Sequence, residues 1–445
     1  MTAASIAAQR FLRLRSVLAY LALLAGIAVF LPFNRYIASA LVVLTILLGW
    51  TNLRRVGRVI LCLVLLSGLV GLVYQPAAVD KAVGNMSRIG ALIITVMLLS
   101  AVLGQSDDLK RISRSLFAGN ALFRYLGMTC GTALLSVPLN FGAVGVVATM
   151  IGVQVREQGD SATARNAARA VVRGFAASPM ASPLSISVVM TVTLLPGLTS
   201  WQVIALGLPF ALLYLFSGAL VREPESAREL LADDCAAAES ALGPWLRFIG
   251  IIALICLGAF ALTACGFVYS QAVTLSCLLA VLVGLVFRRV CDGAVAMPSL
   301  GMANNELAIM GGSSFLGGVI GSFALGWLGA DFTLPVVLWP LIAMAVPWLF
   351  FLGGTLGINP IISGTLSGSI LGPIWPEYGL AGLGLAMIAG WGITISGTPY
   401  SANALLLERC TGYDAREASY GWSMRFSLIM LVICSACCAL LSLPW

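Results

Sequence analysis

The chain has 445 residues, of which 60% are hydrophobic and 10% are charged; because a soluble domain carries about a quarter charged residues, this composition excludes an ordinary soluble protein and indicates a membrane protein. The formal net charge of +7 is spread over short loops, which excludes a concentrated basic surface for nucleic acid. The sequence has no histidine, so it lacks the usual general base of enzymes and the commonest metal ligand.

Apolar stretches near the membrane-spanning length recur along the whole chain, and they lack the alternating pattern of a membrane β-barrel. We therefore expect an all-α polytopic membrane protein with about 11 transmembrane helices. The 11 cysteines mostly fall inside these stretches without zinc-ligand spacing, so we interpret them as small hydrophobic residues. Residues 1–35 are predicted to form an N-terminal helix, and no cleavage site follows its apolar part, so we expect it to be retained.

Residues 36–222 are predicted to form a first structural repeat. Its first three spans are expected at roughly 37–50, 59–75 and 89–104. Basic residues gather in the loops after the second and fourth spans of the chain, namely Arg54, Arg55, Arg58, Lys110, Arg111, Arg114 and Arg124. Because loops rich in Arg and Lys stay in the cytoplasm, we expect a bacterial inner-membrane protein with a cytoplasmic N-terminus and a periplasmic C-terminus.

The apolar segment 125–155 is too long for one untilted span and too short for two. Pro138 and Asn140 interrupt it in the middle. Its flanks are basic, with Arg124 on one side and Arg156, Arg165, Arg169 and Arg173 on the other. A re-entrant hairpin keeps both flanks in the cytoplasm, because it enters and leaves the membrane from the same side. The alternative, one long kinked helix, would place a basic cluster outside, so we favour a hairpin.

Residues 166–195 are predicted to form a broken helix, since Pro179 and Pro183 stand among small hydroxyl residues and would unwind the backbone there. A further span is expected at roughly 201–221. The stretch 223–245 is polar and rich in acidic residues. We expect it to be a solvated cytoplasmic linker between the two halves of the chain.

Residues 246–445 are predicted to form a second repeat. Within it, the apolar segment 334–371 is again too long for one span, and Asn359 followed by Pro360 interrupts it. Its flanks lack basic residues, which favours a position on the outer side of the membrane. We therefore expect a second hairpin, of opposite orientation to the first. Residues 379–408 are predicted to form a second broken helix, with its interruption between Ser396 and Asn403.

The two halves match in order and spacing. Asn140 precedes Pro183 by 43 residues, and Asn359 precedes Pro399 by 40 residues. An odd number of crossings separates the hairpins, so the repeats are predicted to be inverted. Paired interruptions at corresponding places in two halves are the best pointer in a sequence to a binding site near the middle of the membrane. Helix N-termini there favour an anionic group, while hydroxyl, amide and carbonyl oxygens coordinate a small cation.

We expect the two hairpin tips and the two broken helices to converge on one site for solute and ion. The residues predicted to bind are Ser136, Asn140, Gly142, Ser178, Ser182, Ser185, Thr355, Asn359, Ser363, Ser396, Thr398, Ser401 and Asn403. Na+ is predicted to bind at Ser136, Asn140 and Ser182, and at Asn359, Ser396 and Thr398.

No Asp or Glu falls at any of the four interruptions, whereas a proton-coupled carrier usually needs a titratable group there. We therefore favour Na+ as the coupling ion and expect no other cofactor. We place Glu306 at the cytoplasmic mouth and interpret it as a structural residue at a helix end. It is also the main candidate if the coupling ion is a proton.

Gly397-Thr398-Pro399, followed by Asn403, is similar to a motif in the second broken helix of the divalent anion/sodium symporters, the dicarboxylate carrier family. Over nearly the whole chain, the order of spans and the two opposed hairpins resemble the ion transporter superfamily, to which that family belongs. The resemblance implies the fold of that superfamily and a homodimer. It also implies an elevator mechanism, in which hairpins and broken helices move as one block against the remaining spans.

The sequence thus predicts a secondary active transporter of a small, anionic solute, with that solute and membrane lipid as its partners and with no nucleic acid and no enzymatic activity. One alternative is a channel or a permease subunit that works with a separate partner protein. The other is a membrane-embedded enzyme acting on a lipid-linked substrate. Such an enzyme needs acids, bases or metal ligands near a membrane face, and the sequence offers few intramembrane carboxylates.

Overall fold

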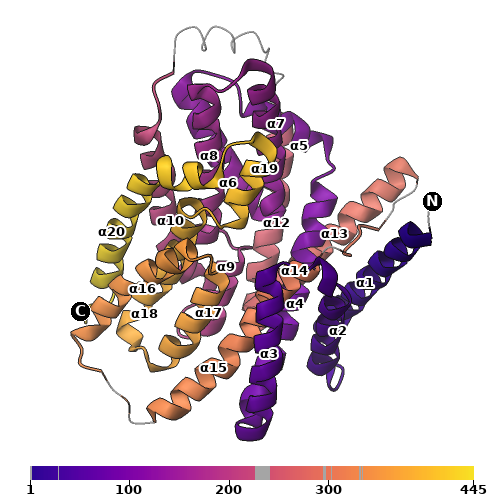
Figure 1. The fold of residues 1–445 in the computed structure, drawn as a ribbon, viewed down its shortest axis with the longest axis vertical. Coiled ribbons are helices and arrows are strands. Elements are labelled where there is room, and N and C mark those ends of the chain that lie inside the picture. The colour runs from indigo at the N-terminus through magenta and orange to yellow at the C-terminus, as the bar shows by residue number, and fades with distance from the viewer. Residues whose placement is uncertain are drawn as a thin grey trace. The chain divides into compact units, whose positions relative to one another are not determined.

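The computed structural model describes residues 3–28, 30–225, 241–293, 297–301, 303–329, 332 and 334–444, and every regular element in these ranges is a helix (Figure 1). Ten helical segments in them are long and apolar enough to cross a membrane, which confirms the predicted all-α, multi-pass membrane protein. They are Arg55–Tyr74, Pro76–Leu103, Ala121–Leu139, Ala162–Leu194, Ser200–Val221, Leu242–Ala264, Tyr269–Val290, Asn304–Leu328, Leu338–Thr355 and Glu377–Thr411. Three shorter apolar helices are Asn34–Leu48, Pro360–Ile374 and Met424–Leu440.

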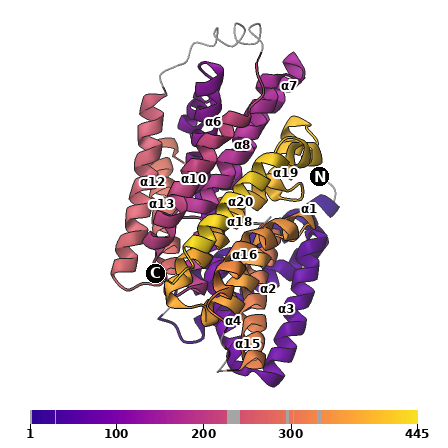
Figure 2. The same ribbon diagram turned by 90° about the vertical axis from the view of Figure 1, so that its left-hand side faces the viewer.

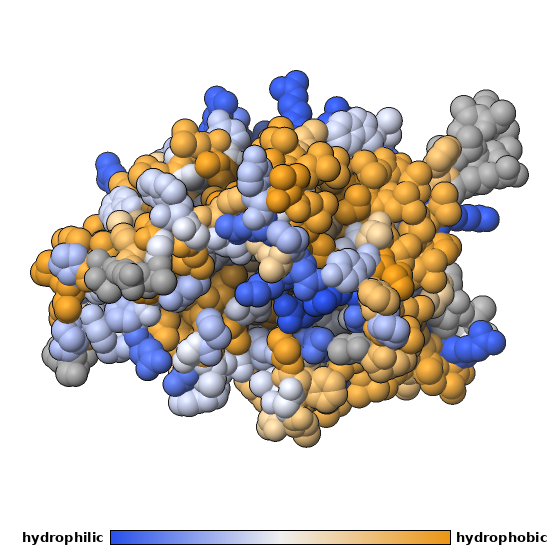
Figure 3. Space-filling view, turned by 90° about the horizontal axis from the view of Figure 1, so that it is seen from below, coloured by the Kyte–Doolittle hydropathy of each residue, from blue (hydrophilic) through white to orange (hydrophobic). Residues whose placement is uncertain are grey.

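Several membrane-length helices expose apolar side chains on most of their surface. In α3 (Arg55–Tyr74) and α12 (Leu242–Ala264), only 28% and 17% of the most apolar stretch is buried in the protein. Leu66, Leu69 and Val73 of α3 are more than half exposed. Hydrophobic residues cover large areas of the surface in Figure 3. In water such surfaces would be strongly unfavourable, so they are the faces that contact lipid acyl chains.

The described helices form two compact units, each of which draws on both halves of the sequence. The first unit comprises Met1–Val102, Ile255–Phe332 and Thr365–Ile374. The second comprises Leu103–Leu254, Thr333–Gly364 and Trp375–Trp445.

The first unit contains α1 (Ala3–Ile27), α2 (Asn34–Leu48), α3 and nearly all of α4 (Pro76–Leu103), followed by the end of α12, α13 (Tyr269–Asp292), the short α14 (Asn304–Glu306) and α15 (Gly312–Leu328). Within it, α1 packs on α2 and α3 packs on α15. Small residues allow close approach: a Cβ added at Gly318 would lie 3.1 Å from the Ala82 side chain.

The second unit contains α5 (Asp107–Ser115), α6 (Ala121–Leu139), α7 (Phe141–Gln158), α8 (Ala162–Ala181), α9 (Ile186–Leu194), α10 (Ser200–Ser217), α16 (Leu338–Thr355), the start of α17 (Pro360–Leu371), α18 (Leu380–Gly397), α19 (Ala402–Thr411) and α20 (Met424–Leu440). The same packing pattern occurs in both halves of the sequence. Helix α8 packs on α6 and α10, and α18 packs on α16 and α20; Figure 2 shows α16, α18 and α20 together.

The structure corrects the expected loop before the fourth span, because α4 begins at Pro76 and is helical through Asp80, Lys81 and Arg88. Asp80, in the second turn of α4, pairs with Arg35 of α2 at 3.1 Å. Of the predicted linker 223–245, residues 226–240 lie outside the described residues.

Candidate functional site

The first interrupted segment consists of two helices that meet at one residue in an unusual backbone conformation. Helix α6 ends at Leu139 and α7 begins at Phe141, and Asn140 between them has φ 49° and ψ −128°. Only glycine adopts this region without strain, and for another residue it costs about 1–3 kcal/mol. The Asn140 amide is half-buried and has no hydrogen-bond partner among the described residues. A strained residue thus presents a free amide at this turn.

The break between α8 and α9 covers residues 182–185, inside the predicted broken helix. Hydroxyl groups satisfy the backbone there. The Ser182 hydroxyl accepts from the Leu184 N–H at 3.3 Å, and the Ser185 hydroxyl caps α9 by accepting from the Val188 N–H at 3.3 Å. The Ser187 hydroxyl donates to the Pro179 carbonyl. Serines therefore replace helical hydrogen bonds that the prolines remove.

The second interrupted segment turns between the end of α16 at Thr355 and the start of α17 at Pro360. Gly357 adopts φ +83°, which permits the turn without strain. The Thr355 hydroxyl donates to the Leu352 carbonyl at 2.7 Å. The Asn359 side chain accepts from the Ile361 N–H at 2.9 Å and so caps α17.

The break between α18 and α19 covers residues 398–401. The Ser401 hydroxyl caps α19 by accepting from the Ala404 N–H at 3.1 Å, and the Thr398 hydroxyl donates to the Thr394 carbonyl at 2.7 Å. Asn403 is fully buried; its amide nitrogen donates to the Val172 carbonyl of α8 at 3.4 Å, while its Oδ1 has no partner among the described residues. A buried amide oxygen left unpaired costs about 1–3 kcal/mol, so this atom is available to a ligand.

The second turn lies against this second break. A Cβ added at Gly354, just before the second turn, would lie 3.0 Å from Thr398 Cγ2, and one at Gly357 would lie 3.8 Å from the Tyr400 side chain. The first turn reaches the same region from another side. The ring of Phe141 stacks on Phe175 of α8 at a centroid distance of 5.0 Å, and α7 packs along α19. The first turn therefore lies on the stretch of α8 that Asn403 also contacts.

The break in α8 lies elsewhere along the same pair of helices. Helices α8 and α18 run antiparallel, since Asn403 bonds to Val172 whereas Gly384 packs near Thr191. The break at Ser182 is therefore about 15 Å further along α8 than Val172, at 1.5 Å per residue. Among the described residues, no hydrogen bond joins the Ser182 or Ser185 side chain to the second break.

The two broken segments are the most buried of the ten membrane-length segments. Within the second unit, 94% of the most apolar stretch of 377–411 and 78% of that of 162–194 is buried. Irregular backbone at membrane depth is tolerated only where protein or a wet cavity surrounds it. At the breaks themselves, Ser182, Leu184, Thr398 and Pro399 are buried, Pro183, Ser185 and Ser401 are half-buried, and Tyr400 is exposed.

The predicted site residues fall into three groups in the structure. The hydroxyls of Ser136, Ser182, Ser185, Thr355, Ser396, Thr398 and Ser401 and the amide oxygen of Asn359 hydrogen-bond to nearby backbone or, for Ser396, also to Tyr214. The side chains of Asn140, Ser178 and Ser363 and the Asn403 amide oxygen have no partner among the described residues. Gly142 is exposed beside the first turn.

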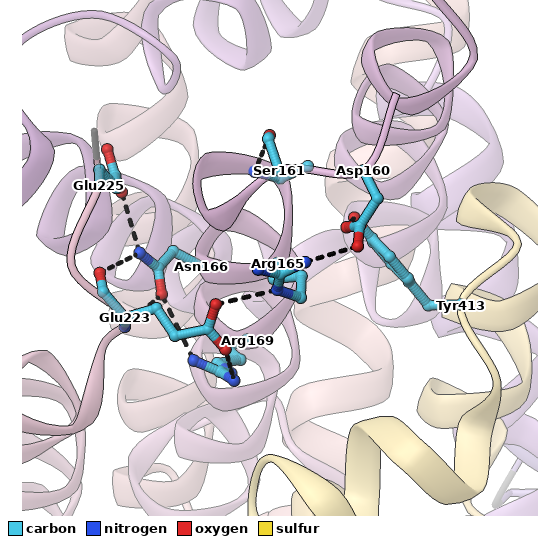
Figure 4. Close-up of polar contacts among 9 residues, drawn as sticks. Asp160, Ser161, Arg165, Asn166, Arg169, Glu223, Glu225 and Tyr413 are labelled. Atoms are coloured by element: carbon cyan, nitrogen blue, oxygen red, sulfur yellow. Dashed lines mark hydrogen bonds and ion pairs between the residues drawn. The ribbon is translucent and has the colours of Figure 1, made fainter. Parts of the chain in front are cut away.

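The basic residues that flank the first interrupted segment are predicted from the sequence to lie on the cytoplasmic side, and three of these arginines, one in α6 and two in α8, are buried within the protein. Arg124, Arg169 and Arg173 are 4%, 7% and 0% exposed. Glu223, after α10, accepts from Arg165 at 2.9 Å and from Arg169 at 2.5 Å (Figure 4). Glu225 pairs with Arg124. The segment after α10 folds back over α8 and neutralises most of these charges.

The four-residue spacing of Arg165, Arg169 and Arg173 is the sequence signal for this cluster, because it places all three on one helix face. Asn166 adds to it by donating to the Glu223 carbonyl and to the Glu225 carboxylate, each at 2.9 Å. None of these side chains was predicted to be structural. Together they join α6, α8 and the segment after α10 within the second unit.

The cluster predicts a specific dependence of stability on pH. Burial alone would raise the pKa of Glu223, but hydrogen bonds and charge from Arg165 and Arg169 lower it below its ordinary value of 4.5. A lowered pKa gives stabilisation that is complete above about pH 4.5 and is lost as the pH falls through the pKa of the folded state. We expect Glu223→Gln to lower the melting temperature at pH 7 and to flatten its decline below pH 4.5, measured by thermal unfolding in detergent. Glu157→Gln, at an exposed position of α7, is the control; identical pH profiles for Glu223→Gln and the wild type would contradict this assignment.

Comparison with solved structures found several similar chains, among them two membrane transporters. The YdaH transporter of Alcanivorax borkumensis aligns with a TM-score of 0.48 and 18% identity, over 81% of this chain and 86% of that chain. MtrF of Neisseria gonorrhoeae, described among a class of antimetabolite efflux pumps, aligns with a TM-score of 0.47 and 14% identity, over 84% of this chain and 83% of that chain. No protein-family model and no curated protein matches the chain.

Proposed function

We propose that this chain is a secondary active transporter of a small anionic solute across the bacterial inner membrane. The observation that carries the proposal is that the two most deeply buried membrane-length segments are the two that are broken. A buried break that served packing alone would have its polar groups paired. At the second break the Asn403 amide oxygen is unpaired, and the nearby Asn140 amide is held free by a strained turn. Free polar groups of this kind suit a site that binds a solute transiently during transport.

The arrangement of the helices supports two inverted repeats with re-entrant hairpins. Each half of the sequence supplies a helix pair joined by a tight turn, α6–α7 and α16–α17, followed by a broken helix. The broken helices α8 and α18 run antiparallel, as inversion of the repeats requires. In this proposal the N-terminus is cytoplasmic, the C-terminus is periplasmic, and the chain works as an elevator-type homodimer of the ion transporter superfamily, close to the divalent anion/sodium symporters.

We propose Na+ as the coupling ion, held by neutral oxygens. Of the two predicted sets, Asn359, Ser396 and Thr398 lie on the second turn and at the second break. Ser136 and Asn140 of the other set lie at the first turn, but Ser182 lies about 10 Å further along α8 than Phe175, on which that turn packs, so it does not share an ion with Asn140. Hydroxyls that donate to backbone carbonyls, such as those of Ser136 and Thr398, keep lone pairs for a cation. The described residues hold no cluster of three or more Asp, Glu or Cys side chains that could bind a metal ion.

Coupling is tested by solute uptake into proteoliposomes. We expect uptake to rise with an inward Na+ gradient at fixed pH, because neutral oxygens bind Na+ but do not carry a proton. Glu306→Gln should leave that dependence unchanged. Uptake that follows the pH gradient at constant Na+, and that Glu306→Gln abolishes, would contradict Na+ coupling but leave the transport proposal intact.

The solute is identified by a thermal-shift screen of the purified protein against carboxylates, sulfonates, inorganic oxyanions and amino acids, with and without Na+. A ligand that binds only the native state stabilises it by about 2.7 kcal/mol at a hundredfold excess over its dissociation constant. We expect at least one anion to raise the melting temperature, and to do so more strongly with Na+. A response confined to uncharged or cationic compounds would exclude an anionic solute.

A further inference from the structure

Arg173 is the one arginine of the α8 face without a carboxylate partner among the described residues. Arg165 and Arg169 share Glu223. The Arg173 side chain is fully buried in the second unit, and only its Nη1 is hydrogen-bonded, donating to the Tyr125 hydroxyl at 2.8 Å and to the Gly218 carbonyl at 3.0 Å. The described structure thus contains a buried guanidinium whose charge is not compensated by an acidic side chain.

The two nitrogens of Arg173 without partners are Nε and Nη2, and both are buried. These N–H groups lie side by side on one edge of the planar guanidinium and point in parallel. Their spacing matches the two oxygens of a carboxylate, which arginine binds through two parallel hydrogen bonds. Burying an unpaired charge and two unpaired donors costs free energy. A ligand bound to Nε and Nη2 would offset that cost.

The surroundings of Arg173 link it to the second break. The residue before it in the chain, Val172, accepts the hydrogen bond from Asn403. The Phe426 ring covers the guanidinium, with its centroid 4.4 Å from Cζ, and packs edge-on against Tyr214, whose hydroxyl bonds to Ser396. Arg173 is therefore joined through direct neighbours to both ends of the 398–401 break.

A second unpaired polar atom lies on the same side of the break. The Ser427 hydroxyl is buried without a partner among the described residues, and a Cβ added at Gly397 would lie 2.6 Å from it. Together with Asn403 Oδ1, it gives the region around the break one free hydroxyl and one free acceptor besides the two donors of Arg173. Donors for an anion and an acceptor for a cation or an N–H group thus occur close together.

We infer that Arg173 binds a carboxylate group of the transported solute through Nε and Nη2. This inference rests on the proposed transport function and narrows the solute to an organic carboxylate. The aromatic cover of Phe426 favours an organic anion over a hydrated inorganic one. Because the guanidinium is fully buried, the carboxylate reaches it in a conformation in which the helices around the break have separated, as alternating access requires.

The test compares ligand binding by the wild type, Arg173→Lys and Arg173→Met in detergent by thermal shift. The probes are succinate and benzoate, their uncharged counterparts succinamide and benzamide, sulfate as a tetrahedral oxyanion, and choline and glucose as other solute classes. We expect a carboxylate to stabilise the wild type and its amide to have no effect. Arg173→Lys should weaken carboxylate binding about tenfold or more, since an ammonium cannot make the paired contact. Arg156→Lys, an exposed arginine of α7, is the matched control.

Melting temperatures without ligand separate binding from a structural role. If Arg173 serves the solute, Arg173→Met should melt no lower than the wild type, because it removes an uncompensated buried charge. A structural role predicts a lower melting temperature.

The inference is overturned if no carboxylate stabilises the wild type, if Arg173→Lys binds carboxylate as the wild type does, or if Arg173→Met melts well below the wild type. Sulfate transport that Asn140→Gly abolishes, with no binding of any carboxylate, would leave the proposed function standing while this inference fails. Carboxylate binding that depends on Arg173, with no flux in proteoliposomes, would support this inference while the proposed function fails.

Discussion

Replacing Asn140 by glycine should reduce transport about tenfold or more while leaving the folded protein as stable as the wild type, or more stable. The turn at Asn140 has φ 49° and ψ −128°, a conformation that glycine adopts freely, so the substitution relieves strain of about 1–3 kcal/mol. It also deletes the free amide. A hydrogen bond to a charged ligand contributes about 1.5–3 kcal/mol, which corresponds to a tenfold to hundredfold change in affinity.

Glycine is the informative substitution at this position. Alanine would remove the amide but keep the strained backbone, so lost transport could reflect a distorted turn. The measurements are flux in proteoliposomes and the melting temperature of the same preparation. Unchanged flux in Asn140→Gly would remove Asn140 from the site, and a lower melting temperature would show that the amide is structural.

Two glycines of the first helix pair should respond in opposite directions to the same substitution. A Cβ added at Gly152 of α7 would overlap the backbone carbonyl oxygen of Cys410 in α19, whereas one at Gly127 of α6 has nothing within 4 Å. Backbone cannot move aside as a side-chain end can, so Gly152→Ala must push α7 away from α19. Overpacking of this kind costs about 1–3 kcal/mol. Gly127→Ala should instead stabilise α6 by about 0.5–1 kcal/mol through helix propensity.

Thermal unfolding of the two alanine variants beside the wild type checks this pair. Gly152→Ala should also lower transport, because α19 begins directly after the 398–401 break and carries Asn403. Equal melting temperatures for Gly152→Ala and Gly127→Ala would mean that α7 and α19 do not pack as closely as the structure has them. Both changes replace glycine by alanine within a helix, so the contribution of helix propensity cancels in the difference between the two melting temperatures.

The positions of the interruptions could be predicted from the sequence because their causes are local. Proline removes a backbone donor and blocks the preceding turn, so Pro183 and Pro399 each fall inside a break, as expected from their neighbours alone. Pro138 and Pro179, which are also expected from the sequence to interrupt their segments, instead lie inside the last turns of α6 and α8, and these helices end one and two residues later. The unusual φ of Asn140 could not be foreseen, since it depends on how α6 and α7 are held by α8 and α19.

The partners of buried charges could not be predicted, because they are set by long-range packing. Arg124 pairs with Glu225, 101 residues away, and Tyr214 bonds to Ser396, 182 residues away. Arg173 looked like one more basic residue of a cytoplasmic flank. Only the packing of α8 against α6 and α10 shows that its side chain is fully buried.

The most direct test of the account is a cryo-EM density map of the protein in lipid nanodiscs with the solute found by thermal shift. The account predicts density for the solute in contact with the Asn140 amide and with residues 398–403, and interrupted helices at 182–185 and 398–401. Continuous helices through these residues, or a solute bound away from both turns, would contradict it.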